Sequence, residues 1–130
     1  MPPVAHLGSL DTTLAGTGIV NSHGAVAGGI FEDGVNLSVD ALGRLVTIGG
    51  SRDAAGNRAP VAWRYLEDGS PDPCFGGGDG VVVFDAVNGA DPPGGQSGVT
   101  GGFLDENDRI VAVGCRANGT NIDMALYRLR

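Results

Sequence analysis

The sequence has few basic residues and no long hydrophobic run. Eight lysine or arginine residues stand against 15 aspartate or glutamate residues, which gives a net charge of −7. Nucleic acids and anionic membranes bind basic surfaces, so we expect neither as a partner. No segment of the chain approaches the roughly 18 apolar residues of a membrane span. Residues 1–4 lack the layout of a signal peptide, so the sequence itself assigns no compartment.

Cysteine and histidine are also scarce. Cys74 and Cys115 are too few for a disulfide framework and are expected to be free thiols. His6 and His23 each lie in a predicted loop, without a partner at a spacing typical of zinc or catalytic sites. Residues 76–80 resemble one calcium-binding turn of a β-roll, but such sites need several stacked copies. We therefore predict no catalytic residue, no metal site and no cofactor.

Glycine and proline are abundant, with 24 and 7 residues, a level at which disorder has to be considered. The chain is nevertheless 42% apolar, and its apolar residues form short β-branched runs, which disordered chains lack. The glycines are therefore interpreted as turn residues. Residues 45–48 and 110–113 are typical of strands buried on both faces, and residues 35–39 alternate as a half-buried strand does.

The chain repeats its motifs in the same order. Three segments occur twice: residues 8–14 and 69–75, residues 40–49 and 105–114, and residues 62–65 and 126–129. The matching positions are 61, 65 and 64 residues apart (72 − 11, 105 − 40, 126 − 62), so only the loops differ in length. Such a period indicates an array in which one unit cannot bury its apolar face alone. We predict a single domain over 1–130, with one repeat at about 8–68 and another at about 69–130.

Each repeat is predicted to hold four short strands. They are the inner strands (35–39 and 99–104), the second (44–49 and 109–114), the third (60–66 and 122–129) and the fourth (18–22 and 81–85). Residues 122–129 also fit the spacing of an amphipathic helix, but their counterpart begins at a proline and is β-prone. The predicted fold is therefore all-β, without substantial helix, in two four-stranded antiparallel blades like those of a propeller.

The repeated motifs resemble the delta-60 repeat, a unit of about sixty residues that occurs in tandem in large bacterial proteins. That family's pattern runs Leu-Asp-x-x-Phe-Gly-x-x-Gly, then an Asp-Gly-Lys turn into Ile-Val-Val-Ala-Gly, then Ala-Arg-Tyr. Its elements correspond here to residues 10–14 and 72–76, to 42–49 and 108–114, and to 63–65 and 127–129. Leu14-Ala15 departs from the family's Phe-Gly, and Asp108 from its turn glycine. The resemblance implies a propeller-like array, usually of more than two units and often in exported or cell-surface proteins, and supplies no catalytic residue.

Two blades do not close a propeller, which needs roughly four to eight. The second repeat is expected to lack a following fourth strand, and residues 18–22 of a neighbouring copy suit that place better than those of the same chain. We therefore expect either a head-to-tail ring of about two to four copies or further repeats of a longer chain. A small self-contained β-sandwich is the alternative fold.

Two pairs of charged residues recur in the repeats. Asp11 and Asp72 each precede a turn, so bonds from their side chains to nearby backbone N–H groups are expected. Arg64 and Arg128 recur beside aromatic residues, which favours packing on a ring or pairing with a carboxylate between blades.

The loops at one end of the blades are the predicted binding residues, because loops vary while strands hold them in place. The candidates for contact with a protein or glycan ligand are His23, Arg52, Asp53, Asn57, Arg58, Arg116, Asn118 and Asn121. The favoured function is a binding or structural module. The alternative is a propeller-type hydrolase or lyase with a site at the ring axis, but the inner strands offer almost no titratable groups beyond Asp40 and Asp105. The balance is against an enzyme.

Overall fold

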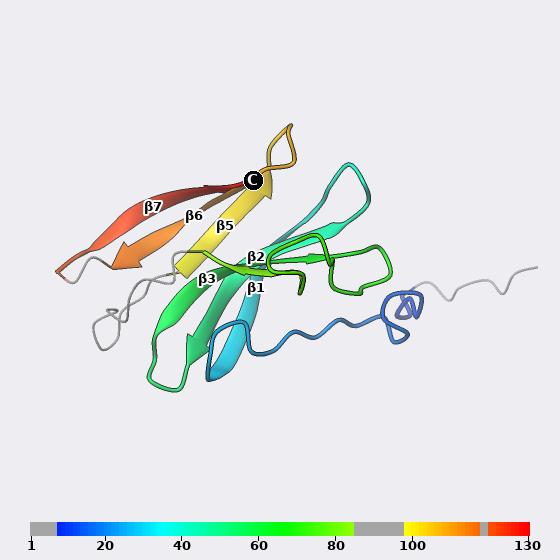
Figure 1. The fold of residues 1–130 in the computed structure, drawn as a ribbon, viewed down its shortest axis with the longest axis horizontal. Coiled ribbons are helices and arrows are strands. Elements are labelled where there is room, and N and C mark those ends of the chain that lie inside the picture. Colours follow the sequence, from blue (N-terminus) through cyan, green and yellow to red (C-terminus); the bar gives the residue numbers. More distant parts are fainter. Residues whose placement is uncertain (1–7, 85–97, 118–119) are drawn as a thin grey trace, which may run out of the picture.

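The computed structural model describes residues 8–84, 98–117 and 120–130, which form two antiparallel sheets (Figure 1). The first sheet has the order β1 (Gly29–Val39), β2 (Leu45–Asp53), β3 (Arg58–Tyr65) and β4 (Val81–Val83). The second has the order β5 (Gly98–Leu104), β6 (Ile110–Ala117) and β7 (Ile122–Leu129). Within these ranges there is no helix, so the predicted all-β class is confirmed, and residues 122–129 are a strand as predicted.

Two expectations about the strands are corrected. Residues 18–22 are not a strand. Only the first sheet has the four strands predicted for each blade; the second has three among the described residues, which agrees with the expected lack of a following fourth strand in the second repeat. A strand exists only when it is paired, and the short apolar pair Ile19-Val20 follows a glycine with a left-handed backbone (Gly18, φ 81°). The first inner strand is longer than predicted, because β1 pairs with β2 from Gly29 onward.

Both sheets contain the same aspartate turn. In the β1–β2 turn, Asp40 accepts hydrogen bonds from two backbone N–H groups at 3.0 and 2.9 Å, and from Arg44 Nε at 2.6 Å. In the β5–β6 turn, Asp105 accepts two backbone bonds at 2.9 and 3.0 Å, and one from Arg109 Nε at 2.8 Å. Each carboxylate therefore fixes the turn and the arginine that follows it.

Both sheets also contain a register shift at their first strand. β1 has two shifts against β2, of which the one between Gly34 and Asn36 corresponds to the single shift of β5 against β6, between Val99 and Gly101. The partner strand has a glycine there: a Cβ at Gly49 would lie 1.8 Å from the carbonyl oxygen of Asp33, and a Cβ at Gly114 would lie 1.8 Å from that of Gly98. No side chain fits at either position, so these glycines are needed for the close backbone approach.

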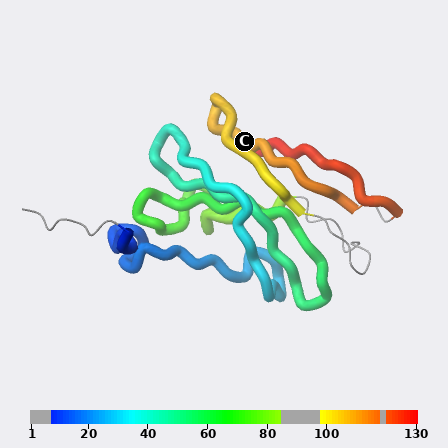
Figure 2. The backbone as a smooth tube through the Cα atoms, turned by 180° about the vertical axis from the view of Figure 1, so that it is seen from behind, coloured from blue at the N-terminus to red at the C-terminus, as the bar shows by residue number. Residues whose placement is uncertain are grey.

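A single apolar core lies between the two sheets. Its buried members are Val46, Ile48, Ala62, Phe75 and Phe84 with the first sheet, and Val99, Ile110 and Ala112 with the second. The ring of Phe84 meets the ring of Tyr127 edge-on, with centroids 5.2 Å apart. Asn36 Nδ2 also donates to the carbonyl of Gly102 across the junction at 2.8 Å. Figure 2 shows the second sheet stacked beside the first.

The two sheets meet with non-equivalent faces. Side chains alternate between the faces of a strand, so Val46 and Ile48 lie toward the second sheet and Leu45 lies on the far face of the first. Ile110 matches Leu45 at the 65-residue offset of the motifs (110 − 45), yet it lies in the core between the sheets. The sheets are therefore stacked in the same sense, front to back, and the two outer faces of the stack differ from each other.

Candidate functional site

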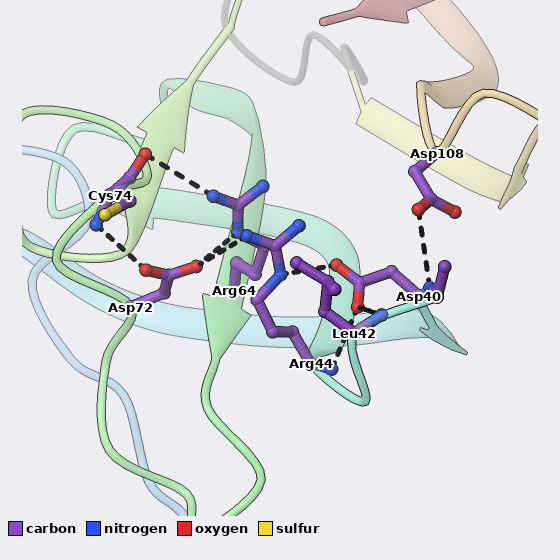
Figure 3. A network of polar contacts seen from close by, with 8 residues as sticks. Asp40, Leu42, Arg44, Arg64, Asp72, Cys74 and Asp108 are labelled. Atoms are coloured by element: carbon purple, nitrogen blue, oxygen red, sulfur yellow. Dashed lines mark hydrogen bonds and ion pairs between the residues drawn. The ribbon is translucent and has the colours of Figure 1, made fainter.

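A charged cluster fixes the segment that follows β3 to the first sheet. Asp72 is 2% exposed, and its carboxylate accepts hydrogen bonds from Arg64 Nε at 2.7 Å and from the Cys74 backbone N–H at 2.8 Å (Figure 3). Arg44 Nη1 lies 3.5 Å from the same carboxylate. The guanidinium of Arg64 also stacks over the ring of Phe75, 4.5 Å from its centroid. Arg44, Arg64, Asp72 and Phe75 are named here the Asp72 cluster.

The carboxylates of this region are held in their charged form. The Cys74 backbone N–H lowers the pKa of Asp72 below 3.8; burial opposes this, and Arg64 adds to the lowering. Burial acts to raise the pKa of Asp40, but the combined hydrogen bonds from Arg44 and Leu42 bring it below 3.8. A carboxylate whose pKa is lowered by folding stabilises the fold above its unfolded pKa, and this contribution disappears as the pH falls through the folded-state value. The cluster is therefore intact at neutral pH, and it weakens when the pH falls below 3.8.

The second sheet has the two arginines of this cluster without its aspartate. Arg109 and Arg128 match Arg44 and Arg64 (109 − 44 = 65, 128 − 64 = 64), and Arg128 lies opposite Val111 as Arg64 lies opposite Val46. They line a groove of about 360 Å³ together with Val111, Leu126, Tyr127 and Arg130. Among the described residues, no carboxylate is paired with Arg128. This arginine groove corresponds to the place that Phe75 fills in the first sheet.

A turn of the same form as the one at Asp72 lies near the start of the described chain, at Asp11. Asp11 Oδ1 accepts a hydrogen bond from the Thr13 N–H at 3.0 Å, and the Leu14 N–H donates to the Asp11 carbonyl at 3.1 Å. The turn at Asp72 has the corresponding bonds at 2.8 and 3.2 Å. The hydroxyl and backbone N–H of Thr13 lower the pKa of Asp11, which is exposed. Both predicted side-chain-to-backbone bonds are confirmed, but only Asp72 contacts arginines within the described residues.

The far face of the first sheet carries a larger apolar groove. It has a volume of about 420 Å³ and lies between residues of the N-terminal segment, such as Leu14 and Val20, and residues of the sheet, such as Leu45, Trp63 and Tyr65. Burial raises the pKa of Tyr65. The segment 11–22 therefore covers part of this face, although it adds no strand to the sheet.

Two buried polar atoms in this groove were missed by sequence reasoning. Glu32 Oε1 accepts a hydrogen bond from the Ala25 N–H, and Ser51 Oγ lies 3.4 Å from the same oxygen. Glu32 Oε2 and Trp63 Nε1 are buried without a hydrogen-bond partner in the part of the chain that the structure describes. Glu32 escaped notice because the inner strand was predicted to begin at residue 35, which left no signal for its burial.

Four of the predicted ligand residues come together in the β2–β3 hairpin. Asp53 accepts hydrogen bonds from the backbone N–H of Asn57 and from its Nδ2, both at 2.9 Å, and these bonds hold the turn. Arg52 lies 5.2 Å over the ring of Phe31, and Arg58 lies opposite Arg52 in the strand pair. Asp53 and Asn57 thus maintain the turn, while the two arginines lie beside each other on it.

The other four predicted ligand residues are more dispersed. Arg116 lies near the end of β6 and Asn121 just before β7, both exposed, and Asn118 lies outside the described residues. His23 lines a groove of about 340 Å³ with Tyr65 and Asp79, and none of the other predicted ligand residues lines that groove. The structure thus brings together the hairpin residues but does not place His23 with them.

The described residues offer no metal cluster and no disulfide. In the described ranges, no group of three or more histidine, cysteine, aspartate or glutamate side chains is placed to hold a metal ion. Neither Cys74 nor Cys115 forms a disulfide. The described structure also has no helix long and apolar enough to cross a membrane.

Comparisons with protein-family models, with curated proteins and with solved structures found no match to the chain. The resemblance to delta-60 repeats therefore stays a prediction from the motifs.

Proposed function

We propose that the chain is a propeller-like repeat module with a binding or structural role, completed by further units that stack on its two outer faces. Those units are second copies of the chain or further repeats of the same kind. The observation that carries this proposal is the front-to-back stacking of the two sheets, which buries Val46 and Ile48 of one against Ile110 of the other. Stacking of this kind can continue at both ends, whereas face-to-face packing of two sheets cannot.

Matched details in the two sheets support the view that they are copies of one unit. Each has an aspartate turn with its arginine, a register shift in its first strand, and a glycine opposite that shift. Each also has the paired arginines at matching register positions. These features depend on backbone geometry as well as on sequence, so they are a stricter test of equivalence than the motifs alone.

The two outer faces both expose apolar side chains and differ in the way that this stacking requires. On the outer face of the second sheet, Met124 is 74% exposed and Leu126 67% exposed. On the far face of the first sheet, Leu37 is 65% exposed beside the groove at Trp63. Exposed apolar surface of this kind marks an interaction site. The outer face of the second sheet corresponds to the face that the first sheet packs against the second, and the far face of the first sheet corresponds to the face that the second sheet packs against the first. Head-to-tail stacking of further units therefore covers both outer faces.

The enzymatic alternative receives no support from a specific contact. Asp40 and Asp105, the acidic residues that follow the inner strands, are both used to hold turns and arginines. The β2–β3 and β6–β7 hairpins lie at the same side of their sheets in the single chain (Figure 1). Arg52 and Arg58 lie next to the first of these turns and Arg116 next to the second, so stacking of further units would continue this edge. This edge is the proposed ligand-binding surface of the completed module.

Hydrogen exchange tests the proposal. We expect the backbone N–H groups of β7 to exchange slowly at high protein concentration and faster on dilution, because a stacked unit covers them only in the assembly. The N–H groups of β3, which lies between two strands in the single chain, serve as the internal reference and stay slow at all concentrations. Exchange of β7 that is fast and independent of concentration would contradict completion by copies of the chain.

A further inference from the structure

We propose that residues 11–22 of a second copy bind along β7, with Asp11 bonded to Arg128, Leu14 in the arginine groove, and residues 19–21 as the fourth strand of the second sheet. This inference rests on the proposed function, since it specifies how one stacked copy holds the next. The occupant is a second copy of this chain, and the binding site is the arginine groove together with the outer edge of β7.

The first sheet provides the template for this contact. There, Asp72 bonds to Arg64, Phe75 fills the space beside Val46 and Ala62, and β4 pairs with β3. The second sheet has the same arginines and a groove in place of the aromatic ring. In the described structure β7 is the last strand of its sheet, so a strand can be added at its outer edge.

Charge favours the N-terminal turn as the occupant. The groove is lined by Arg109, Arg128 and Arg130. Among the described residues, the carboxylate that forms an ion pair with one of these arginines is Asp105, which pairs with Arg109. Asp11 is exposed and already lies in the turn geometry that Asp72 uses when it binds Arg64. The turn therefore binds without a change of backbone conformation, which lowers the entropy cost of association.

The register follows from the hydrogen bonds that close the two turns. The Gly80 N–H donates to the Phe75 carbonyl at 3.1 Å, and the Gly18 N–H donates to the Leu14 carbonyl at 2.7 Å. Gly18 thus matches Gly80, and residues 19–21 match β4. Because Val82 lies opposite Ala62 in the first sheet, we expect Val20 of the second copy to lie opposite Leu126.

The same chain does not supply this strand in the structure. Its Leu14 and Val20 line the groove on the far face of the first sheet, and that face points away from the second sheet. The N-terminal segment and β7 lie at opposite ends of the molecule in Figures 1 and 2. The segment covers the outer face of the first sheet. In the same way, Phe84 at the end of β4 belongs to the first sheet and contacts Tyr127 of the second sheet, which follows it in the stack. The N-terminal segment thus has the position that the last strand of a preceding unit would have.

Cross-linking tests the register. In a background with Cys74→Ser and Cys115→Ser, we expect Val20→Cys with Leu126→Cys to form disulfide-linked dimers and larger chains on a non-reducing gel. Opposed Cα atoms of an antiparallel pair are about 4.5–5.5 Å apart, within the range of about 4.4–6.8 Å for disulfides. The matched control is Val20→Cys with Met124→Cys, because Met124 is similarly exposed but lies two residues away. Equal cross-linking of both pairs, or cross-links within single chains, would overturn the inference.

Charge reversal tests the ion pair independently. Asp11→Arg is expected to weaken self-association at least about tenfold, and adding Arg128→Asp is expected to recover part of the loss. Asp68→Arg is the control: Asp68 accepts a bond from the Ser70 N–H at 2.9 Å, as Asp11 does from the Thr13 N–H at 3.0 Å, so the two variants lose equivalent turn contacts. If the wild type associates and both variants weaken it equally, the inference is wrong while the proposed function stands. A wild type that never associates overturns both this inference and completion of the module by copies of the chain.

Discussion

Replacement of Phe84 by alanine is expected to lower the free energy of unfolding by about 3–5 kcal/mol. Phe84 is 7% exposed in the core between the sheets, and its ring meets Tyr127 of the second sheet. The change removes contacts on both sides of the junction and leaves a cavity that neither sheet can fill without moving. Urea denaturation followed by circular dichroism measures the loss.

The control for this change is Phe103→Ala, which removes the same side chain from a site that is 60% exposed. Its expected cost is below about 1 kcal/mol. If both variants lost the same stability, the two sheets would not share the core described above. If Phe84→Ala melted only the second sheet, the sheets would be separate folding units.

Substitution of Gly114 by alanine is expected to cost about 3 kcal/mol, at the upper end of overpacking effects. The new methyl group would lie 1.8 Å from the carbonyl oxygen of Gly98, so β5 and β6 would have to separate at the register shift. Gly49→Ala is expected to behave alike, since its methyl group would meet the Asp33 carbonyl at the same 1.8 Å. Equal costs at the two sites would indicate that both sheets are built on one plan.

Gly77→Ala is the reference for this pair, because a Cβ at Gly77 would meet nothing within 4 Å. Its expected effect is within about 0.5 kcal/mol. Thermal unfolding of the three variants side by side measures the differences. A Gly114→Ala protein as stable as Gly77→Ala would show that the close backbone approach at β5 is not required.

The sequence predicted the strands better than it predicted their partners. Short β-branched runs such as 45–48 and 110–113 became β2 and β6, because alternation and burial are local properties. Residues 18–22 were predicted as a strand on their likeness to 81–85, but a strand also needs a pairing edge. Local patterning shows which segment suits a strand, and it does not show which chain provides the edge.

The candidate site was partly visible in the sequence. The recurrence of Arg64 and Arg128 beside aromatic residues predicts ring stacking or a carboxylate partner between blades. Arg64 has a ring contact with Phe75 and an ion pair with Asp72, but both partners lie between β3 and β4 of its own sheet and not in the other sheet. The contribution of Arg44 was not visible, because it depends on the hairpin that brings Arg44 beside β3. The burial of Glu32 was hidden for a similar reason, since it depends on the full length of β1.

The central claim is that copies of this chain stack head to tail through unlike faces. Its most direct test is the mass of the wild-type protein in solution, measured by light scattering over a range of concentrations. Head-to-tail stacking of copies predicts a folded assembly whose mass is a multiple of 13.1 kDa, with about two to four copies if the ring closes. A stable, folded particle of 13.1 kDa at every concentration would contradict it.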